Sequence, residues 1–469
     1  MTKNLSAGIA MMGSSSLLAL LIWSNRAFLI NIILVIYVFK GYLLRPYISI
    51  FENKLSPQSL KYLESNIGYY NPEAAAVVYW SLFSLLFAWF LGLILIRSPK
   101  RNNVFTLPKL FLRIDQNVKF GGLPFWGSFL LLMALSYQDP TKGLSLATEG
   151  GDGGGLFLWG LSSLTIITYI CLFEFLKKQS TGLALKRIDY LLLLPAFLEF
   201  TQGAIAGSRS ALFKYLIVGV AFWLYLYRQK IWKILAMVKA SVIATLFLGL
   251  TIVLGLFSQA LRPLLKYQVG ISLDAILEVV NWDTVIRNKE LLYFGISELL
   301  YRLADLKAPF LILNNLYVHE PFQYYNPLAT SMRIINDLIP GTVFPNVRSI
   351  NQLFEFIYEG RDVFYSSEMW HIQGTLYIYF GHFFAPIIVL LFAIITAYLY
   401  PTLEKYFKLS AAFSAFVILL LFDLFENGTA ERIVVVDIVR PVMSIIIFSL
   451  VFRGFNIIFS KKPGSTSTL

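Results

Sequence analysis

Residues 366–400 read SSEMWHIQGTLYIYFGHFFAPIIVLLFAIITAYLY, a short polar run followed by a long apolar one. The apolar part, residues 375–400, exceeds the roughly 20 residues with which an α-helix crosses about 30 Å of hydrocarbon. Similar apolar runs recur on both sides of it, and polar loops separate them. The chain is therefore predicted to be an all-α polytopic membrane protein.

The apolar runs predict about 11 transmembrane helices, within a range of 10 to 12. Composition agrees, because 57% of the 469 residues are hydrophobic and 14% are charged, whereas about a quarter of a soluble domain is charged. The predicted helices cover residues 6–23, 27–44, 74–96, 122–137, 156–176, 188–207, 211–227, 236–260, 375–400, 409–425 and 433–452.

The net charge of +12 would suggest a nucleic-acid partner in a soluble protein, but here the basic residues gather in short loops between apolar runs. Loops of this kind mark the cytoplasmic side of a membrane protein, so no nucleic acid is expected as a partner. The single cysteine, Cys171, excludes disulfides within the chain. The basic clusters that fall on one side of the predicted topology are residues 97–119, 177–187, 228–233, 405–408 and 453–462.

Three regions follow from this pattern. Residues 1–261 are predicted to form an N-terminal transmembrane bundle and residues 262–372 a large extracytoplasmic loop with short helices. Residues 373–469 are predicted to hold the C-terminal transmembrane helices and a basic cytoplasmic tail. The sequence has no internal repeat of fixed period, Gly-rich phosphate loop, paired-cysteine site or HExxH motif. Neither ATP-driven work nor a metal or other cofactor is therefore expected.

Charges inside apolar runs are candidates for function, because a charge is costly in hydrocarbon. Asp437 and Arg440 are three residues apart, so on a helix they share a face and can pair. Arg432 lies just before them. The group is either a structural ion pair or the wall of a polar cavity. Glu199, in the middle of the run 188–207, is expected to be hydrogen-bonded to a neighbouring helix rather than catalytic.

A second set of cations lies at the predicted outer boundary. Arg209 belongs to the short turn GSRS at 207–210, Lys214 follows about one turn into the next run, and Arg262 opens the long loop. Backbone amides of a short turn bind oxyanions, and guanidinium groups match phosphate oxygens in pairs. These cations predict an anionic ligand such as a pyrophosphate headgroup. Alternatively, Arg209 only anchors its hairpin to lipid headgroups.

The long loop ends in a candidate catalytic pair. A helix that begins near Ser367 would place Glu368 and His371 on one face, where one can orient the other as a general base. Earlier in the loop, residues 297–306 predict an amphipathic helix. Arg348 lies in the proline-rich strip IPGTVFPNVRSI, which is predicted to be extended.

Three stretches carry a resemblance: GSRSALFKY at 207–215, IPGTVFPNVRSIN at 339–351, and SSEMWHIQGTLYIYFGHFFAPIIV at 366–389. In this order, they resemble the Wzy-type oligosaccharide repeat-unit polymerases of bacterial surface polysaccharides. The resemblance covers roughly residues 199–400. The chain departs from the pattern at Ser210, where many members have glycine.

The resemblance implies a GT-C-like glycosyltransferase in the bacterial inner membrane, with a cytoplasmic C-terminus and a periplasmic loop. Such enzymes transfer a glycan from an undecaprenyl-pyrophosphate donor to a sugar hydroxyl of a lipid-linked acceptor, without a metal. Arg209 and Arg348 would hold the pyrophosphate, and Glu368 would activate the acceptor. Besides the lipid-linked oligosaccharide, membrane lipids are expected partners and a chain-length regulator is a candidate one. Charge placement alone adds Arg262, His371, Arg432 and Arg440 to the candidate site.

Other functions stay open at this point. An O-antigen ligase would use the same kind of site with a different acceptor. A flippase or transporter of lipid-linked glycans would also place cations in a membrane cavity, but along a whole translocation path and with similarity between two halves. A membrane-embedded scaffold would use the same charges structurally.

Overall fold

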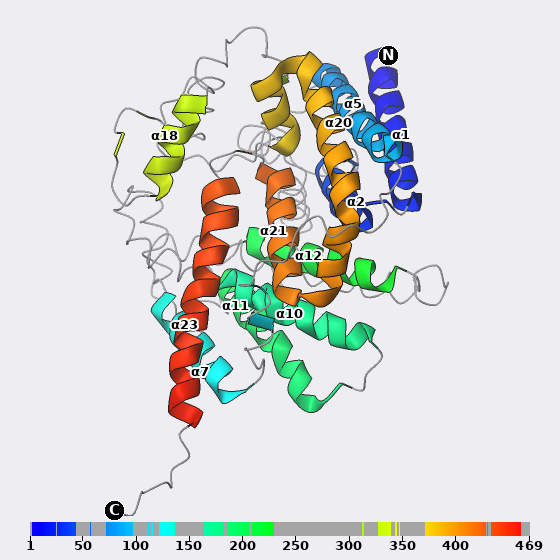
Figure 1. Ribbon diagram of the computed structural model, residues 1–469. Helices are drawn as coiled ribbons and strands as arrows, with labels where there is room; N and C mark the ends of the chain where they lie inside the picture. Colours follow the sequence, from blue (N-terminus) through cyan, green and yellow to red (C-terminus); the bar gives the residue numbers. More distant parts are fainter. Residues whose placement is uncertain are drawn as a thin grey trace, which may run out of the picture.

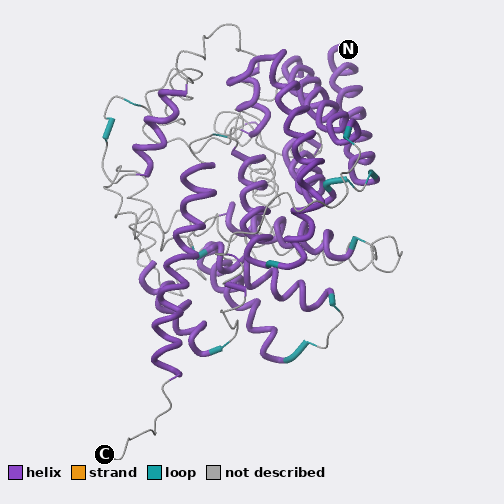
Figure 2. The backbone as a smooth tube through the Cα atoms, viewed as in Figure 1, coloured by secondary structure: helices purple, strands orange, loops and turns teal. Residues whose placement is uncertain are grey.

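The computed structural model describes residues 2–24, 26–43, 72–96, 122–136, 164–181, 185–205, 209–228, 327–338, 371–427 and 433–460, with a few isolated positions between them. Every regular element within these ranges is a helix (Figures 1 and 2). The predicted all-α class is therefore confirmed for the described part of the chain.

Each predicted apolar run except 236–260, which lies outside the described residues, overlaps one or two described helices, although 156–163 is also outside the described residues and the runs 188–207 and 433–452 are each divided between two elements. The elements are α1 (Thr2–Trp23), α2 (Phe28–Val38), η1 (Phe39–Leu43), α5 (Pro72–Leu95), α7 (Leu123–Ser136), α10 (Thr165–Ser180), η2 (Arg187–Leu193), α11 (Leu194–Ile205), α12 (Arg209–Tyr227), α18 (Pro327–Leu338), α20 (His371–Leu409), α21 (Ala411–Asn427), η5 (Ile433–Val439) and α23 (Arg440–Ser460).

Several described helices have the length and composition to cross a membrane. Large apolar side chains such as Leu5, Phe383 and Leu450 are exposed on them, as a surface that faces lipid requires. The total of about 11 spans and the GT-C-like arrangement stay predictions. The four longest candidates are Leu5–Trp23, Ala76–Leu95, His371–Leu409 and Ile433–Phe459, and shorter apolar helices occupy Phe28–Tyr42, Leu123–Leu135 and Ile217–Tyr227.

Little of the predicted loop 262–372 falls in the described ranges. Its main described element is the short helix α18, which packs against η5. The amphipathic helix predicted at 297–306 lies outside the described residues.

Helices α1 and α5 run side by side in the same direction (Figure 1). In their N-terminal halves, the Trp80 indole donates a hydrogen bond to Ser6 Oγ at 2.8 Å. Just past the end of α1, the Arg26 guanidinium donates to the carbonyl of Leu93 at 2.6 Å. Contacts between equivalent ends make the pair parallel, so the chain must return between them. Helix α2 provides the first part of that return.

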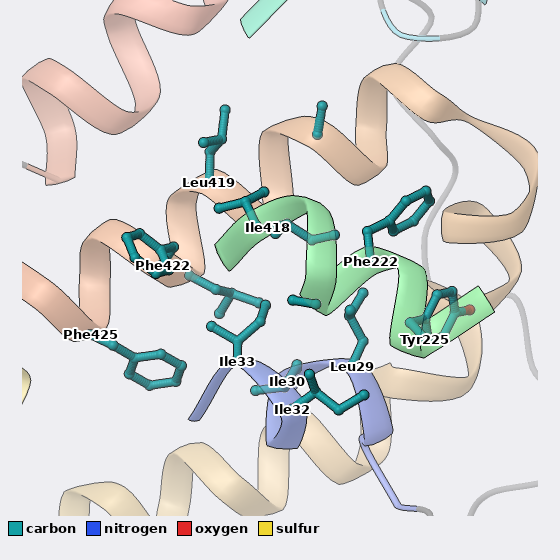
Figure 3. Close-up of a cluster of buried hydrophobic side chains, with 14 of the residues drawn as sticks. Leu29, Ile30, Ile32, Ile33, Phe222, Tyr225, Ile418, Leu419, Phe422 and Phe425 are labelled. Atoms are coloured by element: carbon teal, nitrogen blue, oxygen red, sulfur yellow. The ribbon is translucent and has the colours of Figure 1, made fainter. Parts of the chain in front are cut away.

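A buried apolar core joins α2, α12 and α21 (Figure 3). Leu29 and Ile33 of α2 face this core, together with Phe222 of α12 and Ile418 and Phe422 of α21. All of these side chains are at most 4% exposed. The core fixes α2 in the interior, and so fixes whatever polar groups its last turn carries.

Helix α20 spans 39 residues, which at 1.5 Å each is about 58 Å and longer than a bilayer core. It is interrupted at Gly381, whose φ of 67° and ψ of −178° are not helical. Beyond this kink the helix packs against α5 so closely that a Cβ on Gly92 would lie 2.6 Å from Ala393 Cβ. The kink lies inside the apolar run predicted at 375–400 and divides it, so that residues 371–380 form a short first segment.

Charged side chains gather where α10, α12 and α20 end. The Arg228 guanidinium contacts a Glu404 carboxylate oxygen at 2.6 Å, and Lys408 contacts the same oxygen at 3.2 Å. Lys177 donates to the carbonyl of Leu409 at 3.2 Å. We call these five residues the basic end. Lys177, Arg228 and Lys408 belong to the basic clusters 177–187, 228–233 and 405–408, which the sequence predicts to share one side.

Candidate functional site

The last turn of α2 lies away from the basic end. Tyr400, one helical turn before Glu404, accepts a hydrogen bond from the Leu29 amide at 3.0 Å, so α2 starts near the basic end. Tyr37 is eight residues further along, which is about 12 Å at 1.5 Å per residue. Tyr37 belongs here to a set of buried polar side chains joined by hydrogen bonds. We call this set the His371 cluster, and its members are Tyr37, Tyr42, Ser81, His371 and Gln373.

His371 is the first residue of α20 and is 1% exposed. Its Nδ1 lies 2.8 Å from the Tyr37 hydroxyl. Its φ of 53° is in the left-handed region, which costs about 1–3 kcal/mol for a residue other than glycine. Left-handed backbone at His371 is not helical, and α20 begins at this residue; residues 367–370 lie outside the described residues, so the helix predicted from Ser367 stays a prediction. Glu368 itself lies outside the described residues.

The two tyrosines meet because the helix widens between them. Residues five apart do not face each other on an α-helix, since they are rotated by about 140°. Here the π-helix η1 follows α2 directly, and its i→i+5 hydrogen bonds bring such residues into line. The hydroxyls of Tyr37 and Tyr42 are 3.3 Å apart. Without this wider turn, Tyr42 would point away from the cluster.

Gln373 connects the tyrosines to α5. Its side-chain nitrogen donates to the carbonyl of Val78 at 2.8 Å and to Ser81 Oγ. The Ser81 hydroxyl in turn donates to the same Val78 carbonyl at 2.8 Å. The Gln373 side-chain oxygen accepts a hydrogen bond from the Tyr42 hydroxyl. One hydrogen-bonded group therefore spans α2, η1, α5 and the start of α20.

Aromatic rings enclose the imidazole of His371. The ring of Tyr37 lies 5.4 Å and the ring of Tyr42 6.1 Å from it, centroid to centroid. Phe425 of α21 stacks on Tyr37 at 5.7 Å. Gly41 faces the imidazole, where an added Cβ would sit 3.6 Å from His371 Cε1. These rings exclude water from the imidazole. Hydrogen bonds are stronger in such an interior than in water, so the contacts of the imidazole influence its protonation.

An ion pair lies beside the cluster. Lys40 of η1 pairs with Glu426 near the end of α21, and the side chains are 12% and 11% exposed. The Lys40 ammonium also lies over the Phe422 ring at 5.7 Å. Asp423, one turn before Glu426, is 5% exposed. The end of α21 therefore adds buried charge next to the neutral groups of the His371 cluster.

Further buried charges lie on η5 and α18, which pack together. Asp437 is in the π-helix η5 and is 3% exposed, and Arg440 begins α23 three residues later. Arg333 of α18 is also 3% exposed and donates to Thr330 Oγ1 at 3.2 Å. η5 also contacts α21, so the buried carboxylates of α21 and η5 belong to adjoining elements.

The structure describes the predicted site residues to different extents. His371 and Arg440 are described with their side chains. Arg209 and Lys214 are placed by their backbone alone, at the first residue and in the second turn of α12. The gathering of the arginines around one ligand stays a prediction. The predicted residues outside the described ranges are Arg262, Arg348, Glu368 and Arg432.

The hydrogen bond predicted for Glu199 is present, whereas its having no catalytic role stays a prediction. The Thr168 hydroxyl of α10 donates to Glu199 Oε1 on α11 at 2.9 Å. This carboxyl group is thus hydrogen-bonded to a neighbouring helix, as expected.

Several polar groups of this region were missed by the sequence reasoning. Lys40 stands inside the apolar run 27–44, and the rule that drew attention to Asp437 would have found it as well. Arg333 follows the same logic less clearly, because α18 is not an apolar run. Tyr37 and Tyr42 carried no signal, since their spacing is that of opposite faces on a regular helix.

The chemistry available to this region is proton transfer. Imidazole is a common proton acceptor and donor in enzymes, and the Tyr37 hydroxyl 2.8 Å from Nδ1 orients this one. Within the described residues no group of three or more His, Cys, Asp or Glu side chains is placed to hold a metal ion. The chain matches no protein-family model, no curated protein and no solved structure.

Proposed function

We propose that the protein is a polymerase of lipid-linked oligosaccharide repeat units. It would transfer a glycan from an undecaprenyl-pyrophosphate donor to a sugar hydroxyl of a lipid-linked acceptor, at the outer face of a bacterial inner membrane. The observation that carries the proposal is a buried imidazole, joined to two phenols, away from the basic end. Because basic residues mark the cytoplasmic side, this position favours chemistry at the opposite face.

The proposed reaction asks for two things. His371 accepts the proton of the acceptor hydroxyl as its oxygen bonds to the anomeric carbon of the donor. The bond from that carbon to the pyrophosphate oxygen breaks, and the lipid pyrophosphate leaves with the electron pair. Fixed cations neutralise the charge that develops on it. Arg209 and Arg348 are the residues expected to provide this charge, and Arg440 is a third.

The test uses purified full-length protein in lipid nanodiscs, given only an undecaprenyl-pyrophosphate-linked repeat unit. Longer lipid-linked glycans, made without nucleotide or divalent metal, are the expected product. His371→Gln and Arg209→Ala should lose product at unchanged protein level. Tyr400→Phe, which removes a buried hydroxyl near the basic end, is the matched control and should keep it.

The remaining outcomes separate the alternatives. Transfer only to a lipid A core acceptor would indicate a ligase instead. Movement of the intact substrate across the bilayer, with no new covalent product, would indicate a transporter. If His371→Gln makes normal product, the proposed role of the buried imidazole is wrong.

A further inference from the structure

The segment that joins α10 to α11 carries an excess of positive charge. Residues 177–198 contain a single carboxylate, on Asp189, and four cations: Lys177, Lys178, Lys186 and Arg187. Lys177 donates to the Leu409 carbonyl at the basic end, and Lys178 pairs with Asp189 at 2.8 Å. One carboxylate cannot neutralise the three cations beside it in the chain, so positive charge remains on the exposed side chains of Lys186 and Arg187.

Asp189 fixes where these two cations lie. Its Oδ2 accepts a hydrogen bond from the Lys186 amide at 2.8 Å, which starts η2, and its Oδ1 accepts one from the Lys178 ammonium at 2.8 Å. The same carboxylate therefore joins the first turn of η2 to the last turn of α10. Lys186 and Arg187 extend from a turn that is already held in place, so a ligand that binds them has little backbone to order.

Helix η2 presents an apolar edge next to these cations. In a 3₁₀-helix, residues three apart are eclipsed, so Asp189 and Leu192 share one edge and Ile188 and Leu191 share another. The first edge is turned toward the protein, since Asp189 contacts α10 and Leu192 is 1% exposed. The second edge is open, with Ile188 51% and Leu191 40% exposed, and Leu194 continues it at 37%. We call these three side chains the apolar stripe, and it begins directly after Arg187.

Tyr190 lies on the remaining edge of η2. Its ring packs 5.7 Å from that of Phe175 on α10, centroid to centroid, and the side chain is still 55% exposed. A tyrosine with a packed ring and an accessible hydroxyl is typical of the boundary between hydrocarbon and water. Residues 186–194 thus combine cations, an interfacial aromatic ring and the apolar stripe in little more than three turns.

We propose that residues 186–194 form a binding site for an anionic phospholipid, in which the two cations bind the headgroup phosphate and the apolar stripe contacts the acyl chains. Guanidinium and ammonium groups form charge-assisted hydrogen bonds with phosphate oxygens. A soluble anion would use the cations alone, and a lipid without net charge would gain little from them. A lipid with a negative headgroup uses both parts of the surface. The site lies apart from the His371 cluster and does not depend on the proposed function.

The test titrates purified full-length protein in detergent micelles with dioleoylphosphatidylglycerol or dioleoylphosphatidylcholine. These lipids share their acyl chains and differ in net charge, and mass spectrometry of the intact complexes gives the affinity of each. Phosphatidylglycerol should bind the wild type more tightly. Lys186→Gln/Arg187→Gln should weaken it about 30-fold, at about 5-fold for each cation near a membrane surface. The matched control is Lys405→Gln/Lys408→Gln, which removes two other exposed cations and should leave the affinity within a few fold.

A second pair of substitutions tests the apolar stripe. Ile188→Ser/Leu191→Ser keeps the cations and should weaken the binding of both lipids, because the acyl chains lose their contacts. All of the substituted side chains are exposed, so none of these variants should fail to fold.

Three results would overturn the inference. They are equal affinity of the wild type for the two lipids, equal losses in the two glutamine variants, and displacement of phosphatidylglycerol by inorganic phosphate at equal concentration, which would indicate a site for soluble anions. No glycan substrate is present in these titrations, so a negative result removes this site and leaves the proposed function to its own test.

Discussion

The two polar regions of this bundle handle buried polarity in different ways. At the basic end, ionised side chains pair in partly exposed positions, with Arg228 23% and Glu404 22% exposed. In the His371 cluster, neutral groups that are almost fully buried form directed hydrogen bonds, and His371 and Gln373 are each 1% exposed. A charge keeps its hydration only where water reaches it, whereas a dry interior favours neutral donors matched to acceptors. We therefore expect the basic end to tolerate exchange of side chains better than the His371 cluster does.

The ion pair of Lys40 and Glu426 does not follow this contrast, because it is charged and yet lies buried beside the His371 cluster. Its removal should change the free energy of unfolding most. Lys40→Met leaves the Glu426 carboxylate buried without its ammonium, which should lower the free energy of unfolding by about 3–5 kcal/mol. The double variant Lys40→Met/Glu426→Gln should recover most of the loss. At the basic end, Lys408→Met removes a 58% exposed charge and should cost less than about 1 kcal/mol. Unfolding in detergent micelles measures all three, and equal losses for Lys40→Met and Lys408→Met would abolish the contrast.

The spacing of α5 and α20 offers a second test. At Gly92 it is set by backbone contact, because a Cβ on Gly92 would lie 2.7 Å from the Leu390 carbonyl oxygen. Gly92→Ala should therefore destabilise the protein by about 1–3 kcal/mol through overpacking. Gly8→Ala is the matched control, since no atom lies within 4 Å of its added Cβ, and better helix propensity should stabilise it by up to about 1 kcal/mol. Equal changes in stability for Gly92→Ala and Gly8→Ala would contradict the close backbone contact between α5 and α20.

Substitutions at the basic end should change the free energy of unfolding only slightly. Arg228 contacts Glu404 and also lies over the rings of Phe28 and Tyr225, 5.9 Å and 5.8 Å from their centroids. Arg228→Lys keeps the charge but loses the flat contact with the rings, and should cost about 0.5–1 kcal/mol. A double-mutant cycle with Glu404→Gln should give a coupling below about 1 kcal/mol that decreases as salt is added. A coupling that salt does not change would show this end to be as dry as the His371 cluster.

The smallest effect is expected at Asp115, whose Oδ1 accepts a hydrogen bond from the Ala412 amide at 3.3 Å. Burial raises the pKa of this carboxyl above its usual value, although hydrogen bonds from Ser410 and Ala412 and the charge of Lys177 oppose the shift. The stability that comes from the neutral acid is thus fully present below the unfolded pKa of about 3.9. It is lost as pH rises through the raised native pKa.

Asp115→Asn removes this titration. At pH 7 the variant should be more stable than the wild type by at most about 1 kcal/mol, the size of one net hydrogen bond. The difference should shrink as the pH falls toward 4. Melting curves from pH 4 to pH 8 measure it, and a gap that widens in acid would reverse the sign of the inferred pKa shift.

The sequence predicted the helices well because an apolar run that can cross a membrane is recognised by its length alone. The bounds predicted at 74–96 and 409–425 lie within two residues of α5 and α21. His371 was found from its position beside an apolar run, without knowledge of its partners. Those partners could not be found, because a π-turn changes which residues face each other and a left-handed residue starts α20. Both are local departures from regular geometry that hydrophobic periodicity does not encode.

The break at Gly381 divides α20 into two segments that can have different roles. A continuous helix transmits any tilt along its whole length, and transmembrane helices tilt to match the thickness of the lipid around them. The glycine adopts its positive φ at no steric cost, so the segment after it can follow the bilayer while residues 371–380 keep their own direction. We therefore expect the imidazole to be less sensitive to membrane thickness than it would be on an unbroken helix.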